Sequence, residues 1–159
     1  PASRTSPLRR QDAEDMTSQP FADPPDVELE LGAVPENVAI ARQALRAVAG
    51  GLHLGRERID DVALAGGEAC ANVVMHAYRG AAPGPMRVRV FVDASALTVV
   101  VADRGGGIAP RPDSPGLGVG IPLMSALADS LELGTAPDGT TEVRLEFALD
   151  AAAARPAGM

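Results

Sequence analysis

Lysine is absent from this sequence of 159 residues, and all 14 of its basic residues are arginine. A phosphate-binding loop of the G-x-x-x-x-G-K-[ST] type needs its lysine, and so does an enzyme that forms a Schiff base with its substrate. The absence therefore excludes both classes, and a nucleotide that binds this protein must be held in another way.

Aromatic residues and positive charge are scarce as well. The chain has no Trp, three Phe and one Tyr, and its formal net charge is −7 at pH 7. Binding to nucleic acid relies on clustered basic groups and often on stacking rings. We therefore expect no direct contact with nucleic acid.

Long apolar runs and paired cysteines are missing too. No apolar run is long enough to cross a bilayer, and the sequence shows no leader with a charged start and an apolar centre. These features predict a cytoplasmic protein with no membrane contact. Cys70 is the only cysteine, so an internal disulfide is excluded, and its Ala-rich surroundings predict a small buried residue.

The composition of the chain predicts one folded domain. With 46% hydrophobic residues, the chain can bury a single core of ordinary size. Residues 1–25 are rich in Pro, Ser and charge and lack periodicity, which predicts a disordered lead, and Met16 within it is a candidate native start. The domain is expected over residues 26–150, with a disordered tail over residues 151–159.

The spacing of apolar residues predicts both strands and helices. Apolar residues at every second position predict strands over residues 26–31, 86–93, 96–103, 131–135 and 141–149. A spacing of three to four predicts helices over residues 35–51, 60–78 and 121–131. Helices in separate runs between hairpin strands favour an α+β fold, a two-layer sandwich with helices on one face of a mostly antiparallel mixed sheet.

Three polar residues, Glu68, Asn72 and His76, stand four residues apart in an otherwise apolar helix. Polar groups beside a buried face need partners or a pocket, because burial without a hydrogen bond costs free energy. The spacing is therefore a candidate site. It is equally typical of an exposed polar stripe, on which residues at i and i+4 are neighbours.

Two glycine-containing segments follow. A predicted strand ends at Asp103 and continues into Gly105, Gly106 and Gly107, so a carboxylate could accept a ligand amine while bare backbone approaches a ring. The same residues are also usual in an ordinary turn. Further on, glycines open the next predicted helix, where backbone N–H groups and the positive helix end can face an anion such as a triphosphate; they are Gly116, Gly118 and Gly120. A flexible loop before a helix is the alternative.

Taken in order, these segments resemble a known family of ATP-binding domains. "EACANVVMHAY" resembles its E-x-x-x-N-x-x-x-H-[AG]-Y box, "DRGGG" its D-x-G-x-G box, "GVG" its second glycine box and "GTT" its closing strand motif. The fold is shared by gyrase, a class of heat-shock chaperones, histidine kinases and mismatch-repair ATPases. The resemblance covers roughly Val27 to Leu149. The small size and the "HAY" ending favour the branch of the anti-sigma factor serine kinases.

The resemblance implies ATP and Mg²⁺ as cofactors and assigns the first motif. Asn72 would offer its carbonyl oxygen to the metal, which prefers oxygen ligands. Glu68 would act as general base on a Ser or Thr hydroxyl of a protein substrate. His76 would be a structural residue, hydrogen-bonded near the site. Gly118 and Gly120 would let the phosphates reach the start of the helix.

The resemblance assigns the adenine contacts as well. Asp103 would hold the adenine amine, with Gly105 and Gly107 at the nucleotide and Thr140 supporting the same edge. Arg42 matches a position that grips the partner protein in the family. The implied partners are a sigma factor and a small anti-sigma-factor antagonist, and the family's habit implies a homodimer.

One departure from the family bears on activity. Between Ile108 and Gly116 the loop is only "APRPDSP", Gly116 stands where Arg is common, and Arg111 is the nearest substitute. Loss of a cationic finger can slow phosphoryl transfer by about three to five powers of ten. The resemblance implies a kinase that phosphorylates the antagonist and sequesters the sigma factor. Because of this departure, the alternative function is a nucleotide-gated binding module that transfers no phosphate. A regulatory domain cut from a larger signalling protein is a third reading.

Overall fold

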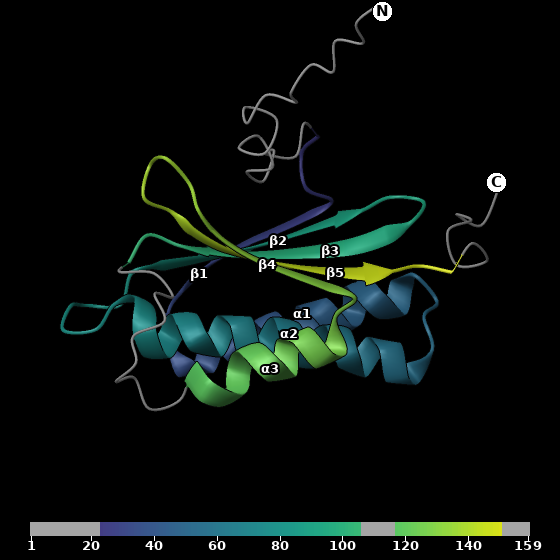
Figure 1. Ribbon diagram of the computed structural model, residues 1–159, viewed down its shortest axis with the longest axis horizontal. Coiled ribbons are helices and arrows are strands. Elements are labelled where there is room, and N and C mark those ends of the chain that lie inside the picture. The colour runs from purple at the N-terminus through teal and green to yellow at the C-terminus, as the bar shows by residue number, and fades with distance from the viewer. Residues whose placement is uncertain (1–22, 106–116, 151–159) are drawn as a thin grey trace, which may run out of the picture.

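The structure, a computed structural model, describes residues 23–105 and 117–150. The described residues form two layers, a five-stranded sheet and helices that cover one of its faces (Figure 1). Most of the predicted lead and the whole predicted tail lie outside the described residues. Within the described part, no helix is both long enough and apolar enough to span a bilayer.

The sheet is antiparallel throughout its described strands. Its spatial order is β1-β2-β3-β5-β4, and the strands are β1 (Val27–Gly32), β2 (Pro85–Val92), β3 (Ala96–Asp103), β4 (Ser130–Thr135) and β5 (Thr141–Ala148). All four neighbouring pairs are antiparallel, so the expected mixed sheet was wrong. Two consecutive helices separate β1 from β2, so the chain reverses direction three times between these strands and enters β2 antiparallel to β1. The predicted α+β sandwich is confirmed.

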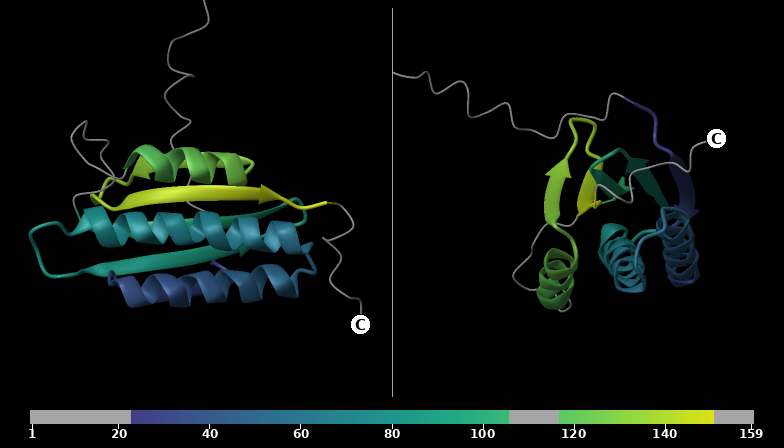
Figure 2. Two further views of the ribbon diagram at one scale, coloured as in Figure 1. Left: turned by 90° about the horizontal axis from the view of Figure 1, so that it is seen from below. Right: turned by 90° about the vertical axis from the view of Figure 1, so that its right-hand side faces the viewer.

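The helices lie side by side on one face of the sheet (Figure 2). They are α1 (Pro35–Gly51), α2 (Arg56–Asn72), its π-helical continuation η1 (Val73–Ala77) and α3 (Leu117–Leu127). The core lies between the layers and contains Leu45, Val99 and Phe147, each at most 1% exposed. Alternation of buried and more exposed residues along β1, β2 and β5 gives the sheet one buried apolar face and one more polar outer face.

Two predicted helix boundaries were wrong. α2 begins at Arg56, four residues earlier than predicted, because its charged first turn carries no apolar spacing. α3 spans Leu117–Leu127, whereas residues 121–131 were predicted. The chain leaves the helix at Asp129, whose backbone N–H donates to the Glu146 carbonyl at 2.9 Å and whose carboxylate accepts the Ala148 N–H at 2.7 Å. These bonds to β5 begin the strand β4.

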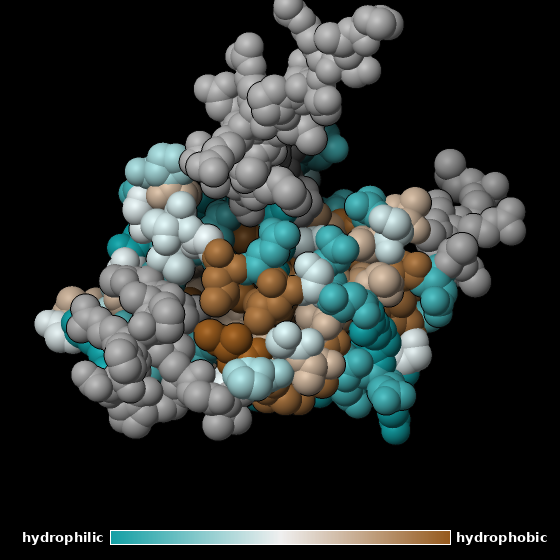
Figure 3. Space-filling model, viewed as in Figure 1, coloured by the Kyte–Doolittle hydropathy of each residue, from teal (hydrophilic) through white to brown (hydrophobic). Residues whose placement is uncertain are grey.

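Apolar side chains also reach the surface around the edge strand β4 and α3 (Figure 3). Leu133 on β4 is 45% exposed, and Leu127 on α3 is half-buried. An edge strand packs on fewer neighbours than a central strand. β3, in the middle of the sheet, is by contrast buried at all eight positions.

Candidate functional site

The predicted site residues Asn72 and Gly120 lie next to each other, where α2 meets the beginning of α3. A Cβ atom on Gly120 would stand 3.1 Å from Nδ2 and 3.2 Å from Oδ1 of Asn72, so α3 passes the carboxamide with bare backbone. Asn72 is 3% exposed, and its Nδ2 has no hydrogen-bond partner among the described residues. A buried amide without a partner is costly unless something else binds it.

Small residues of α2 allow this close packing of the helices. A Cβ on Gly66 would stand 2.2 Å from Cδ1 of Leu45 on α1, so a larger residue there would force the Leu45 side chain to move. α3 also packs on α2. The small residues of the segment "AGGEACAN" thus let α1 and α3 pack close to the C-terminal part of α2, which ends at Asn72.

Asp103, the last residue of β3, is 2% exposed. Its Oδ1 accepts the N–H of Gly105 at 2.9 Å. Burial raises the pKa of its carboxyl group, and the bond from Gly105 opposes that shift. By strand alternation Asp103 is in phase with Val99 and Val101 of the core, so it belongs to the helix-covered side of the sheet.

The raised pKa of Asp103 predicts a stability cost. Because folding favours the protonated carboxyl group, its ionised form destabilises the fold above the raised pKa, and this cost disappears as pH falls through it. We expect Asp103→Asn to raise the melting temperature of the nucleotide-free protein by a few degrees at pH 7. The gain should shrink in melting curves recorded at successively lower pH. A lower melting temperature, or a gain that is constant with pH, would contradict this prediction.

Thr141, which the sequence analysis passed over, is the register partner of Asp103 across β3 and β5 and is 8% exposed. Thr140, the predicted residue, lies in the preceding turn, where its N–H donates to Oδ1 of Asp138 at 2.9 Å. The signal for Thr141 was present in "TEVRLEF", because Thr141 is in phase with the buried Val143 of the same strand. The structure places Thr141 beside Asp103 on the helix side, whereas Thr140 and Asp103 both line a cavity on the outer face of the sheet, and the role of Thr140 toward a nucleotide stays a prediction.

The predicted glycines fall into three groups. Gly105 touches the end of η1, since a Cβ there would stand 2.0 Å from the carbonyl oxygen of Ala77. Gly118 belongs to α3, so its backbone is at the beginning of that helix. Gly107 lies outside the described residues.

Glu68 lies one helical turn before Asn72 on α2 and is half-buried. Among the described residues it has no hydrogen bond or ion pair, so its carboxylate is free to accept a proton or a donor. A turn of α-helix separates Glu68 from Asn72 by about 5 to 6 Å. Both side chains therefore face the same region.

His76 lies in the π-helical segment η1 and is 8% exposed. Its Nδ1 is 3.1 Å from a guanidinium nitrogen of Arg79. Burial lowers the pKa of the imidazole, and the positive charge of Arg79 lowers it further. The ring is therefore neutral at pH 7, and its Nδ1 accepts the hydrogen bond from Arg79. This geometry agrees with a structural role.

Arg42 of α1 lies across α2. A Cβ on Gly67 would stand 2.5 Å from Nε and 2.9 Å from Nη2 of Arg42, so glycine makes room for the guanidinium. The Nε atom is buried and has no partner among the described residues. Arg42 is half-buried in the contact between the two helices, and its role toward a partner protein stays a prediction.

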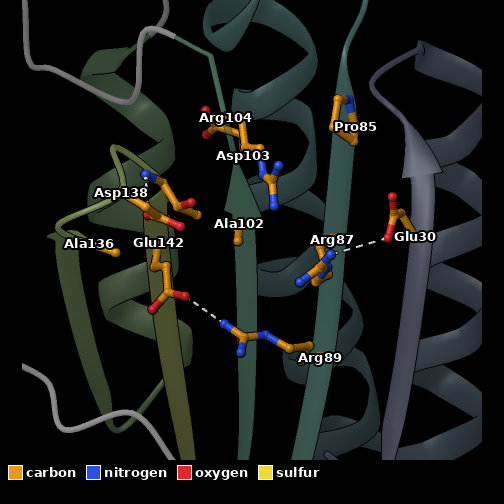
Figure 4. A pocket seen from close by; sticks show the side chains of 11 residues that line it. Glu30, Pro85, Arg87, Arg89, Ala102, Asp103, Arg104, Ala136, Asp138 and Glu142 are labelled. Atoms are coloured by element: carbon orange, nitrogen blue, oxygen red, sulfur yellow. Dashed lines mark hydrogen bonds and ion pairs between the residues drawn. The ribbon is translucent and has the colours of Figure 1, made fainter.

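A cavity of about 290 Å³ opens on the outer face of the sheet, with the helices behind it (Figure 4). Two of the three arginines that line it are paired, Arg87 with Glu30 at 3.3 Å and Arg89 with Glu142 at 2.5 Å, and the third is Arg104. Asp103 and Thr140 line it, whereas Asn72 and Glu68 do not. We place the candidate site on the helix side of the sheet because Asn72 and Glu68 lie there and the buried Nδ2 of Asn72 has no partner among the described residues.

Comparison with known proteins gives a consistent result. Residues 31–147 match the profile of a family described as the histidine kinase-like ATPase domain. The chain is 33% identical over 138 residues to the serine-protein kinase RsbW of Bacillus pumilus, covering 76% of this chain and 85% of that protein. It is 29% identical over 126 residues to the anti-sigma F factor of Clostridium beijerinckii, covering 72% of this chain and 88% of that protein.

A solved structure has the same fold. The crystal structure of the RsbU and RsbW domains of a Mycobacterium tuberculosis protein aligns with a TM-score of 0.60 at 19% identity. The alignment covers 79% of this chain and 32% of that longer chain. At this identity the likeness establishes the fold only.

Proposed function

This chain belongs to the histidine kinase-like ATPase domain family, in the branch of the anti-sigma factor serine-protein kinases, and from this we propose its function. It is an ATP-dependent anti-sigma factor that phosphorylates a Ser or Thr of a small antagonist protein and sequesters a sigma factor. The observation that carries the proposal is the buried carboxamide of Asn72 beside the bare backbone of Gly120: its Nδ2 has no partner among the described residues and could donate to a phosphate oxygen, which would leave its Oδ1 for the metal.

The residues around Asn72 fit ATP with Mg²⁺. A carboxamide oxygen is the hard ligand that Mg²⁺ prefers, and the metal usually completes its shell with water and phosphate oxygens. The beginning of α3, with Gly118 and Gly120, offers N–H groups and the positive end of an 11-residue helix. Mg²⁺-bound ATP would supply the phosphoryl group and neutralise its charge.

Adenine recognition is assigned to the other end of the site. Asp103 would accept a hydrogen bond from the adenine amine, a contact that favours the ionised carboxylate and offsets its burial. Thr141, across from Asp103 in the sheet, would support the same edge of the base. Gly105 holds the turn after Asp103, while Gly107 stays a prediction from the sequence.

Glu68 would perform the proton transfer. Its free carboxylate lies one turn from Asn72, on the side where an incoming hydroxyl would approach the terminal phosphate. A carboxylate oxygen of Glu68 would take the proton of that Ser or Thr hydroxyl as the hydroxyl oxygen bonds to the terminal phosphorus of ATP, whose bond to the bridging oxygen breaks so that ADP leaves. The proton ends on the Glu68 carboxyl group.

The partner assignments follow the family. Arg42, at the α1–α2 contact, would take part in binding the sigma factor or the antagonist, and the protein would act as a homodimer. The alternative, a nucleotide-gated binding module without phosphoryl transfer, is favoured by the seven residues "APRPDSP" and by Gly116 in place of Arg. The two readings share the nucleotide site and differ only in the chemical step.

The deciding experiment follows radiolabelled phosphate from ATP to a small antagonist protein encoded in the same genome, beside calorimetry of ATP with Mg²⁺. Kinase activity predicts stoichiometric labelling of Ser or Thr. If the protein binds ATP but labels no antagonist, the kinase function is rejected and the nucleotide-gated binding module is supported. If no ATP binding is detected at millimolar nucleotide, both the kinase and the nucleotide-gated binding module are rejected.

Asp103→Asn is expected to weaken ATP binding by about 1.5 to 3 kcal/mol, because it removes a charged acceptor from the ligand's amine. Titration calorimetry of both proteins measures the difference. The same variant is expected to be more stable without nucleotide, so a loss of affinity cannot be attributed to unfolding. Equal affinities would show that the adenine contact has been misplaced.

A further inference from the structure

Tyr78, the residue directly after η1, connects three segments of the chain. Its hydroxyl group donates to the carbonyl oxygen of Pro85 at 2.5 Å and accepts the backbone N–H of Arg104 at 3.1 Å. Its ring lies against Gly84, where a Cβ would stand 2.3 Å from the ring atom Cε1. Tyr78 thus joins the end of η1 to the beginning of β2 and to the residue that follows β3.

A second contact fastens the same place. The backbone of Gly105 packs so closely on the carbonyl oxygen of Ala77 that a Cβ there would stand 2.0 Å from it. We call the contacts of Ala77 and Tyr78 with Gly84, Arg104 and Gly105 the Tyr78 clamp. The clamp holds the turn after β3 from the side of η1.

The clamp acts on both residues that follow Asp103. The backbone N–H of Arg104 donates to the hydroxyl of Tyr78, and the N–H of Gly105 donates the bond that holds Oδ1 of Asp103 at 2.9 Å. η1, which carries the clamp, continues directly from Asn72. The two ends of the candidate site, on a helix and on a strand, are therefore fixed relative to each other through Tyr78.

We propose that Tyr78 is a positioning residue for recognition of the base, because it sets the place of the Asp103 carboxylate relative to Asn72. This inference rests on the proposed function, in which Asp103 accepts the adenine amine. A hydrogen bond weakens steeply when its angle and distance leave a narrow range, and a binding group must be held within about 0.5 Å of its productive position. In this proposal Tyr78 acts through the position of Asp103 and not through a contact of its own with the nucleotide.

The test compares ATP with inosine triphosphate, which has a carbonyl oxygen where adenine has its amine. Wild type should bind ATP more tightly than inosine triphosphate. Tyr78→Phe keeps the ring on Gly84 and loses both hydrogen bonds of the hydroxyl. We expect its Kd for ATP to rise about fivefold to tenfold, with the Kd for inosine triphosphate unchanged within about twofold. The preference for adenine should fall by the same factor.

Arg104→Ala is the matched control. Tyr78 contacts the backbone N–H of Arg104, and this group survives the substitution, so both Kd values should stay within about twofold of wild type. A variant that is only destabilised would weaken both nucleotides equally, and that result would overturn the inference. If wild type prefers ATP over inosine triphosphate and Tyr78→Phe has the same preference, the inference about Tyr78 is wrong while the role of Asp103 stands. A wild type that binds both nucleotides equally would overturn the role of Asp103 and the inference with it.

Discussion

Glu68→Gln is expected to bind ATP and Mg²⁺ as tightly as wild type and to transfer phosphate about two to four powers of ten more slowly, the usual contribution of a positioned base. Gln keeps the size and the oxygen of Glu but cannot take a proton. Glu68 is half-buried and has no internal partner among the described residues, so the substitution breaks no contact of the fold. The measurement is the rate of radiolabel transfer to the antagonist at saturating ATP.

The control for this variant lies on the same helix. Glu57→Gln changes an exposed glutamate in the first turn of α2, far along the helix from Asn72, and should keep the transfer rate within about twofold. A Glu68→Gln protein that labels the antagonist at the wild-type rate would remove Glu68 from the chemical step. Weaker ATP binding in that variant would place Glu68 at the nucleotide instead of at the hydroxyl.

Strand positions could be predicted because alternation reports burial directly. In "TEVRLEF" every second residue is buried in the structure, and in "MRVRV" the buried Met86, Val88 and Val90 alternate with arginines that pair on the outer face. Helix ends were harder. The first turn of α2 is charged and has no side-chain cap, so nothing in its local sequence marks Arg56 as the beginning.

The motif residues could be predicted in part. Asn72 and Gly120, distant in sequence, adjoin in the structure as the resemblance implied, and Asp103 ends its strand in the buried layer. Thr140 and Thr141 are adjacent and chemically alike, so composition does not distinguish them. Only the pairing of Asp103 with Thr141 across the sheet does. Which of the two threonines lies on the helix side therefore depends on register, which is a long-range property.

Contacts between segments that are distant in the sequence could not be predicted, because no local sequence pattern indicates them. Arg42 lies against Gly67 because of the way α1 packs on α2. The residues around Arg42 and Gly67 in the sequence do not indicate this contact. The hydroxyl group of Tyr78 reaches Arg104, 26 residues away, because η1 ends beside the turn after β3. Such contacts follow from packing of the whole domain. π-helical segments like η1 are rare and occur frequently at functional sites, but the sequence of η1 is compatible with an ordinary α-helix.

Asn72→Ala should lose phosphate transfer and the part of ATP affinity that depends on Mg²⁺, by about one to two powers of ten in Kd. The reason lies in the geometry of α2. One helical turn separates Glu68, which in the proposed function would face the incoming hydroxyl, from Asn72, which would face the phosphate-bound metal. The measurement is ATP titration in the presence of Mg²⁺ and again with a chelator. With the chelator, wild type and variant should bind ATP equally within about threefold.

The stability of Asn72→Ala separates a metal ligand from a structural amide. Asn72 makes no hydrogen bond among the described residues, and its buried Nδ2 is left without a partner, so Ala removes a desolvation cost and no contact of that kind. The melting temperature without nucleotide should therefore stay the same or rise. Asn37, the only other asparagine, donates to the Gly32 carbonyl at 2.8 Å, and Asn37→Ala should lower stability slightly without changing ATP affinity. A destabilised Asn72→Ala protein that keeps its Mg²⁺-dependent affinity would make Asn72 a packing residue and would remove the observation on which the proposed nucleotide site depends.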